Sequence, residues 1–155
     1  MKWIFCIALF VLCLAVSMLF TRKYFKRKTF YYNIYFFNEK LLAEIVFSKL
    51  PLPKFIEKNN NLGDCLTFFD SEQKIYSADL YKKITYLTED EKEYFFDYYQ
   101  MLGKSDARSQ REYLESVRQE LQQKKTQEEE NYKKHFTLNI KLGILAGLVG
   151  ILIIL

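Results

Sequence analysis

Glycine and proline are scarce in this sequence, which has 5 Gly and 2 Pro among 155 residues. Neither GxxxxGK nor GxGxxG occurs, so the glycine-rich loops that hold phosphates are excluded and nucleotide hydrolysis is not expected. No segment repeats with a period of about 20 to 50 residues, which argues against a solenoid. Half of the residues are hydrophobic, including 14 Phe and 12 Tyr, so a long disordered chain is also excluded.

Histidine and cysteine, which carry much of enzyme and metal chemistry, are equally scarce. The one histidine, His135, follows two lysines, which leaves no means to build a catalytic triad or a histidine metal site. Cys6 and Cys13 share an apolar stretch and Cys65 stands apart, so we expect neither a CxxC motif nor a disulfide. We therefore predict no catalytic residue, cofactor or metal, and a protein that is not an enzyme.

Carboxylates are the remaining candidates for chemistry, and they are densest at Glu89, Asp90, Glu91, Glu93 and Asp97. Acids in the first turn of a helix complement the helix dipole, so a solvated helix start explains this cluster without catalysis. Use of the same acids as a docking face for a basic partner stays open.

The formal net charge of +4 is unevenly distributed along the chain. The first 28 residues contain six basic residues and no acid, whereas the other 17 Lys and Arg are outnumbered by 19 Asp and Glu. The excess of positive charge therefore belongs to the N-terminal segment alone. This segment interleaves aromatics with cations, but its place beside an apolar stretch favours anionic lipid headgroups over nucleic acid as its partner.

An uncharged stretch of 18 residues, from Trp3 to Phe20, predicts an N-terminal transmembrane helix within residues 1–21. A cleaved signal peptide is the alternative, since Lys2 precedes the stretch and Ala15 to Ser17 resembles a cleavage site. The basic run after the stretch favours an uncleaved anchor whose C-terminal side is cytoplasmic. That run consists of Arg22, Lys23, Lys26, Arg27 and Lys28.

A second apolar segment ends the chain and predicts a transmembrane helix over residues 138–155. Leu142–Leu155 alone is short for a crossing, but Lys141 can reach the headgroups and so extend the span toward Leu138. A monotopic or core helix is the alternative. Small residues at two four-residue spacings fit close helix packing or ordinary lipid-facing glycines; they are Gly143, Ala146, Gly147 and Gly150.

Residues 22–121 predict a cytoplasmic helical bundle of five to six helices, which makes the fold all-α. The first helix continues from the membrane to Leu50, because residues 24–50 contain no Gly or Pro and place apolar residues at helical spacing. Pro51 and Pro53 break it, and one of them suits the first turn of a helix that ends near Asn59. Short helices are expected over 62–72 and 78–86, the second capped by Ser77.

The later helices carry clear end signals. Thr88 and Glu91 have capping-box spacing, and Gly103 fits the helix end that follows, where φ is positive. Ser105 or Asp106 can cap the last helix, which could continue into the membrane. Residues 122–137 of that helix predict a solvated stalk. Within the first helix, Glu44 lies near the apolar face and needs a partner if it is buried.

Several segments together resemble the stage III sporulation protein AB family of endospore-forming bacteria. The most specific are Leu42-Ala43-Glu44-Ile45, then Pro51-Leu52-Pro53, and Leu102-Gly103-Lys104-Ser105-Asp106 with Gln110. The resemblance implies a multi-pass protein of the mother-cell membrane around the forespore. It also implies membership of the channel complex assembled there, with that complex's other membrane subunits as partners, and homo-oligomers are possible.

That family is similar in its cytoplasmic bundle to platform protein F of type II secretion machines. The analogy implies that the bundle docks a secretion-type ATPase, the sporulation protein AA of the same operon. Glu44, Pro51, Leu52, Pro53, Gly103, Ser105 and Asp106 match the family motifs and are expected to be architectural before they are contact residues. An alternative is a membrane-anchored adaptor or sensor whose bundle binds a ligand or a response protein, which a sizeable apolar pocket inside the bundle would indicate.

Overall fold

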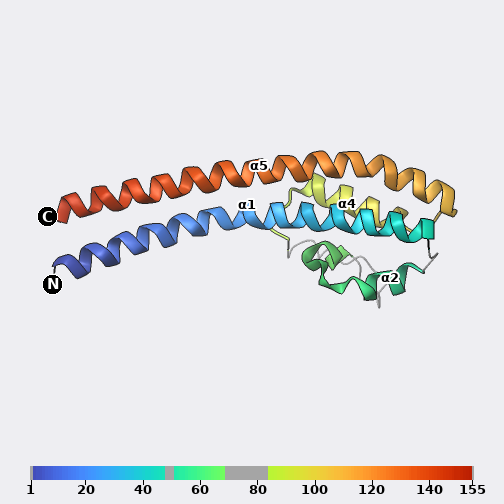
Figure 1. The fold of residues 1–155 in the computed structure, drawn as a ribbon, viewed down its shortest axis with the longest axis horizontal. Helices are drawn as coiled ribbons and strands as arrows, with labels where there is room; N and C mark the ends of the chain where they lie inside the picture. Colours follow the sequence, from blue (N-terminus) through green and yellow to red (C-terminus); the bar gives the residue numbers. More distant parts are fainter. Residues whose placement is uncertain (1, 48–50, 69–83, 155) are drawn as a thin grey trace. The chain divides into compact units, whose positions relative to one another are not determined.

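The computed structural model describes residues 2–47, 51–68 and 84–154, and within them the protein is helical and has no strand (Figure 1). The prediction of an all-α fold is therefore confirmed. The elements in chain order are α1 (Lys2–Phe47), α2 (Leu52–Lys58), the 3-10 helix η1 (Asn60–Phe68), α4 (Glu89–Met101) and α5 (Ala107–Ile154).

Two long helices dominate the chain. α1 has 46 residues and α5 has 48, so each is about 70 Å long at the rise of an α-helix. α1 contains no Gly or Pro, and nothing in its sequence ends it before Phe47. The predicted continuity of the first apolar segment with the first bundle helix is confirmed over the described residues, as is that of the last helix with the second apolar segment.

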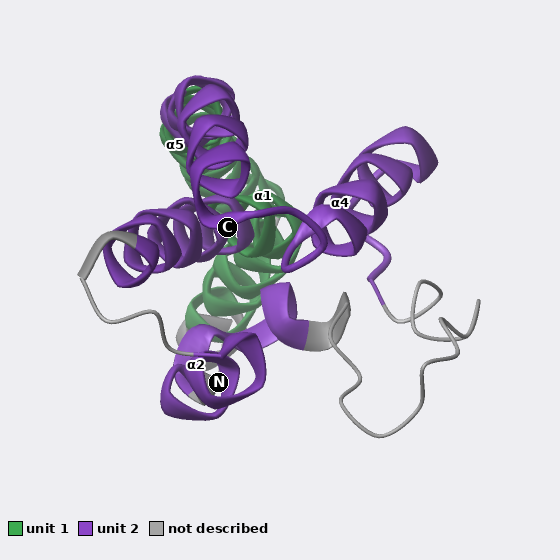
Figure 2. Cartoon of the chain, turned by 90° about the vertical axis from the view of Figure 1, so that its right-hand side faces the viewer, with its two compact units in different colours: residues 1–28, 127–155 green, residues 29–126 purple. Residues whose placement is uncertain are grey.

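The chain divides into two compact units (Figure 2). Unit 1 consists of residues 1–28 and 127–155, the two terminal segments of the long helices. Unit 2 consists of residues 29–126 and contains the remainder of α1 and α5 together with α2, η1 and α4.

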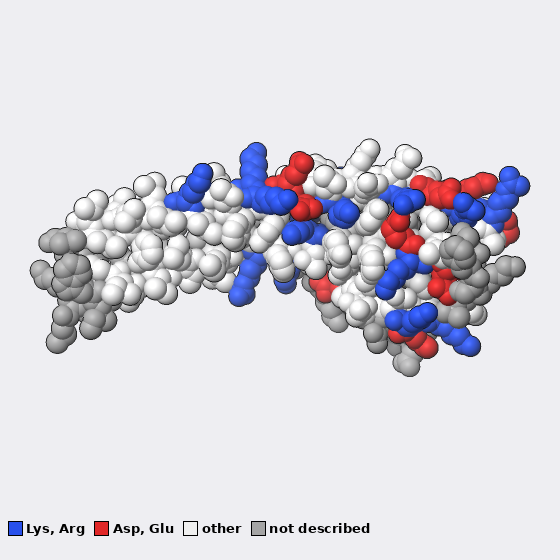
Figure 3. Space-filling model, in the orientation of Figure 1, with Lys and Arg blue, Asp and Glu red and all other residues white. Residues whose placement is uncertain are grey.

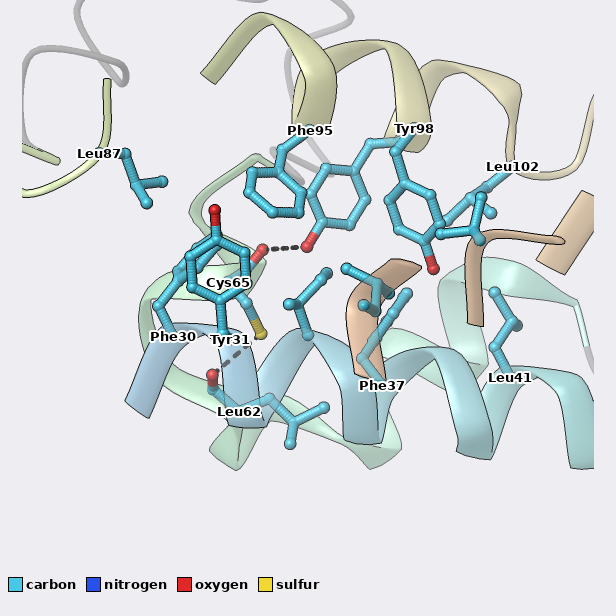
Figure 4. Close-up of a cluster of buried hydrophobic side chains, with 14 of the residues drawn as sticks. Phe30, Tyr31, Phe37, Leu41, Leu62, Cys65, Leu87, Phe95, Tyr98 and Leu102 are labelled. Carbon is cyan, nitrogen blue, oxygen red and sulfur yellow. Dashed lines mark hydrogen bonds between the residues drawn. The ribbon is translucent and has the colours of Figure 1, made fainter. Parts of the chain in front are cut away.

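Aromatic side chains fill the core of unit 2 (Figure 4). On α1, Phe30, Ile34 and Phe37 are at most 2% exposed, as their helical spacing predicts. Phe30 meets Phe95 of α4 edge to face, with ring centroids 5.0 Å apart. The predicted stripe on α5 is also buried, and it consists of Leu114, Val117 and Leu121.

Local signals explain most helix ends in unit 2. Pro53 lies in the first turn of α2, where the missing N–H is not needed. Thr88 and Glu91 form the predicted capping box at the start of α4: the Thr88 side chain accepts from the Glu91 N–H, and the Glu91 carboxylate accepts from the Thr88 N–H at 2.8 Å. Gly103, just after α4, has φ +75°, which favours glycine.

The segment between α2 and α4 differs from its prediction. Residues 60–68 form a 3-10 helix interrupted at Gly63, whose φ of +61° and ψ of −139° are not helical. Thr85 and Tyr86 form a turn and Ile84 is not helical, so the end of the helix expected over 78–86 is wrong at these three residues. Its cap Ser77 and residues 78–83 lie outside the described residues. The predicted count of five to six helices is not confirmed.

Candidate functional site

In unit 1 the terminal segments of α1 and α5 pack against each other in antiparallel directions. The three glycines among the predicted small residues of α5 lie at this contact. A Cβ on Gly147 would come within 2.4 Å of the Phe10 ring, and one on Gly143 within 2.9 Å of Ser17 Cβ. Gly150 is equally close to Leu9. These three glycines let the two backbones approach, whereas Ala146 is exposed.

The outward surface of unit 1 is apolar. Large hydrophobic side chains there are exposed, such as Phe20 at 71% and Leu152 at 75%. On the face drawn in Figure 3, the described side chains of the terminal part of this unit include no charged one. Both long helices are long and apolar enough to cross a membrane. Small residues inside and large apolar residues outside suit a lipid surrounding.

Polar side chains also join the two helices of unit 1. The Ser17 hydroxyl donates to the backbone oxygen of Asn139, and the Asn139 side chain donates to Thr21 Oγ1 at 3.1 Å. Thr21 in turn donates to the backbone oxygen of Ser17 at 3.2 Å. The sequence analysis missed this group, because only the helix pairing brings residue 139 beside residues 17 and 21.

The basic run at residues 22–28 is divided in its contacts. Arg27 forms a bidentate ion pair with Glu128, at 2.8 Å and 3.1 Å, and Lys28 lies over the Tyr132 ring at 5.0 Å. Beside them Tyr24 stacks on His135, with centroids 3.8 Å apart. Three cations of the run remain exposed, namely Arg22, Lys23 and Lys26.

The predicted stalk at residues 122–137 is helical, but its expected solvation is wrong at one position. Glu128 is only 6% exposed, because it is covered in its pairing with Arg27. A surface charge pattern read along one helix cannot show this, since the partner lies on the other helix.

Two family motifs meet in unit 2. A Cβ on Gly103 would lie 3.8 Å from Leu52, so the start of α2 and the turn after α4 are neighbours. Gln110 is 5% exposed, and its side-chain oxygen accepts from the Gly103 N–H at 2.9 Å and from the Ser105 hydroxyl at 3.4 Å. The motif that includes Gln110 is therefore a hydrogen-bonded turn.

Asp106 caps α5. Its carboxylate accepts from the Ser109 N–H at 3.4 Å, and the hydrogen bonds with Ser109 lower the pKa of Asp106. Pro51 precedes α2 in an extended conformation, and its oxygen accepts from the Phe55 N–H at 3.1 Å. Glu44 is half-buried on α1 and is engaged in an interaction. These placements agree with architectural roles and leave contact roles as predictions.

The acids of α4 are partly used inside the fold. Glu91 closes the capping box and accepts from the Tyr31 hydroxyl at 2.8 Å, while Glu89 pairs with Lys92. Glu91 also borders a pocket of about 190 Å³ between α1, α4 and α5. Its lining includes four charged side chains, which are Asp90, Glu91, Glu120 and Lys124.

Buried tyrosines form a second group that the sequence analysis missed. Tyr98 donates to Asn38 at 3.0 Å, and Asn38, which is fully buried, donates to the backbone oxygen of Leu114 at 3.1 Å. Tyr99 donates to the backbone oxygen of Cys65 at 2.5 Å (Figure 4). Burial raises the pKa of the Cys65 thiol to about 12, so this thiol is protonated and a poor nucleophile at neutral pH.

The described residues contain no group of three or more His, Cys, Asp and Glu side chains that could hold a metal ion. Cys6, Cys13 and Cys65 are free thiols. The features that stand out among the described residues are therefore a pair of apolar helix segments and a packed helical unit.

The family model described as stage III sporulation protein AB matches residues 2–155. No curated protein and no solved structure matches the chain.

Proposed function

Because the chain belongs to the stage III sporulation protein AB family, we propose that it is a platform subunit of the channel complex between mother cell and forespore. The family is not a known enzyme family, and the two candidate spans indicate a membrane protein. In this role the protein crosses the mother-cell membrane twice, and residues 29–126 dock a secretion-type ATPase in the mother-cell cytoplasm.

The observation that carries the proposal is the place of unit 2 in the chain. A helical unit with its own aromatic core is inserted between two apolar segments that pair with each other through small residues. The paired segments supply an anchor, and the inserted unit supplies a rigid surface for a protein partner. Such a surface suits a subunit that recruits another protein and performs no chemistry itself.

The packing of unit 2 favours this role over that of a ligand sensor. The centre of the unit is filled by rings that meet edge to face, such as Phe37 with Phe55 and Phe30 with Phe95. The pocket at Tyr31 is about 190 Å³, below the roughly 300 to 1,000 Å³ of ordinary ligand sites, and it is lined by charged groups. Neither feature suits an apolar ligand.

The test is capture of the ATPase by the full chain in detergent micelles. We expect the full chain to retain the ATPase. Reversal of a charge on one exposed face at a time tests which face is the docking surface. Glu93→Lys changes the acidic side of α4 and Glu112→Lys changes an exposed position of α5. Weaker capture by one of them would locate the docking face.

The cellular counterpart uses a chain from which residues 29–126 are deleted. Failure of capture by the intact chain, together with normal membrane recruitment of the ATPase in cells that carry the deletion, would overturn the proposal. Binding of the ATPase to the deleted chain would do the same, because it would place the contact in the anchor.

A further inference from the structure

An apolar groove runs along the helix pair of unit 1. It has a volume of about 350 Å³ and lies between α1 and α5. Leu12, Val16 and Phe20 line it from α1, while Asn139, Gly143 and Ala146 line it from α5. Two of its α5 lining residues, Gly143 and Ala146, are small, and Ala146 is exposed, so little side-chain volume fills this part of the groove.

We propose that this groove binds one acyl chain of an anionic phospholipid, whose phosphate is held at Lys23. The proposal requires membrane insertion only and is independent of the docking of an ATPase.

The first argument for a lipid chain is the position and length of the groove. Its α1 residues run from Leu12 to Phe20 and span about 12 Å of helix. Half of a bilayer's hydrocarbon core is about 15 Å thick, so the groove extends through most of one leaflet. The Phe20 end of the groove borders the basic run, and the headgroups of the same leaflet therefore lie at this end.

The second argument is the positive charge at the Phe20 end of the groove. Lys23 follows Phe20 by three residues and Val16 by seven, so it lies on the groove face of α1. Lys23 is exposed and has no hydrogen bond or ion pair to a described residue, whereas Arg27 on the same face is held by Glu128. Arg22 follows Phe20 by two residues and therefore points away from the groove. On the groove face of α1, Lys23 is therefore the described cation available to meet a lipid phosphate.

The test is photo-crosslinking of the full chain in phosphatidylcholine vesicles. The probes carry a diazirine in the acyl chain and either a phosphatidylglycerol or a phosphatidylcholine headgroup. We expect adducts on the peptides with residues 12–20 and 139–146, and about fivefold more adduct from the anionic probe, which corresponds to one cation near the surface. Lys23→Gln should abolish this preference, and Arg22→Gln should retain it.

A second pair of variants tests the groove itself. Ala146→Leu fills the groove from an exposed position and should reduce labelling by both probes, whereas Ala15→Leu, exposed and outside the lining, should not. The thermal midpoint of each variant in micelles reports whether the helix pair is intact. Equal labelling by the two probes, labelling unchanged by Ala146→Leu, or crosslinks to a second protein at these peptides would overturn the proposal.

Discussion

Tyr98 and Asn38 join all three long segments of unit 2 through buried hydrogen bonds. Tyr98 comes from α4 and Asn38 from α1, and the chain of donors ends on the backbone of α5 at Leu114. Both side chains are at most 1% exposed. Removal of one partner leaves the other buried without a bond, which costs more than the bond itself contributes.

Tyr98→Phe should therefore lower the free energy of unfolding by about 1 to 3 kcal/mol, because Asn38 Oδ1 loses its donor. Thermal unfolding of the full chain in micelles, followed by circular dichroism, measures the loss. Tyr32→Phe removes the same hydroxyl from an exposed position and should change stability by less than about 0.5 kcal/mol. Equal effects would show that the buried network contributes nothing.

Asp106 gives unit 2 a dependence on acid. Its pKa is lowered by hydrogen bonds with Ser109, so the ionised carboxylate stabilises the fold above the ordinary pKa of 3.8. This contribution should disappear as the pH falls through the lowered pKa. Asp106→Asn should keep a cap but make the thermal midpoint less dependent on pH in the acidic range. Asp106→Ala should have the same effect in acid and should also lower the thermal midpoint at neutral pH. If both variants keep the same fall of the thermal midpoint at acidic pH as the unchanged chain, this role of Asp106 is contradicted.

At the scale of elements, the packing of the helix pair in unit 1 depends on glycines, which have no side chain. A Cβ on Gly147 would overlap the ring of Phe10 at 2.4 Å, and one on Gly150 would overlap the tip of Leu9 at 2.6 Å. A leucine tip can rotate away, whereas a ring is a rigid plane that must move as a whole.

Gly147→Ala should destabilise the pair by about 1 to 3 kcal/mol, and Gly150→Ala should have a smaller effect. Unfolding of the full chain in mild detergent by added SDS measures the loss of stability in both variants. Adding Phe10→Ala to Gly147→Ala should restore part of the loss, since the new methyl group then has room. A double variant less stable than Gly147→Ala alone would argue against this contact.

The ion pair between Arg27 and Glu128 ties the same two helices. Their side chains are 15% and 8% exposed, so removal of one leaves a largely covered charge, which costs up to about 3 to 5 kcal/mol at buried sites. Arg27→Met should therefore be more destabilising than Arg27→Met with Glu128→Leu, and the same SDS titration compares them. Arg108→Met breaks an exposed pair with Glu112 and should change stability by about 0 to 1 kcal/mol.

At the scale of the whole molecule, the proposed topology predicts where the chain can be labelled. Gln127→Cys and Lys104→Cys should react with a membrane-impermeant maleimide only after the cells are opened, because both exposed positions are proposed to be cytoplasmic. Cys65 should contribute little background, since it is buried and its pKa is raised. Labelling of either new cysteine in intact cells would reverse the proposed orientation.

Local patterns predicted most of the fold, because they depend on neighbours in the sequence. The helical spacing of Phe30, Ile34 and Phe37 identified the buried face of α1, and the spacing of Thr88 and Glu91 located the start of α4. The helix expected to end at Tyr86 does not include its last three predicted residues, 84–86, because propensity at a helix end is easily overridden by tertiary contacts.

Contacts between distant segments were beyond the reach of the sequence. Arg27 was assigned to lipid headgroups, but its partner is Glu128, 101 residues away. The hydrogen bond of Tyr98 with Asn38 likewise depends on how α1 and α4 pack. The small residues near the C-terminus were noticed, but only the pairing distinguishes Gly147, which meets α1, from Ala146, which lines the groove.

The two units impose opposite limits on how the sequence can change over evolution. In unit 1 the contact between the helices excludes anything larger than glycine at Gly147, while outward positions such as Leu152 need only remain apolar. In unit 2 the filled core excludes anything much smaller than the rings at Phe37 and Tyr98. Relatives of this chain should therefore keep small residues where the helices of unit 1 meet and large ones in the core of unit 2, even where little else of the sequence is shared.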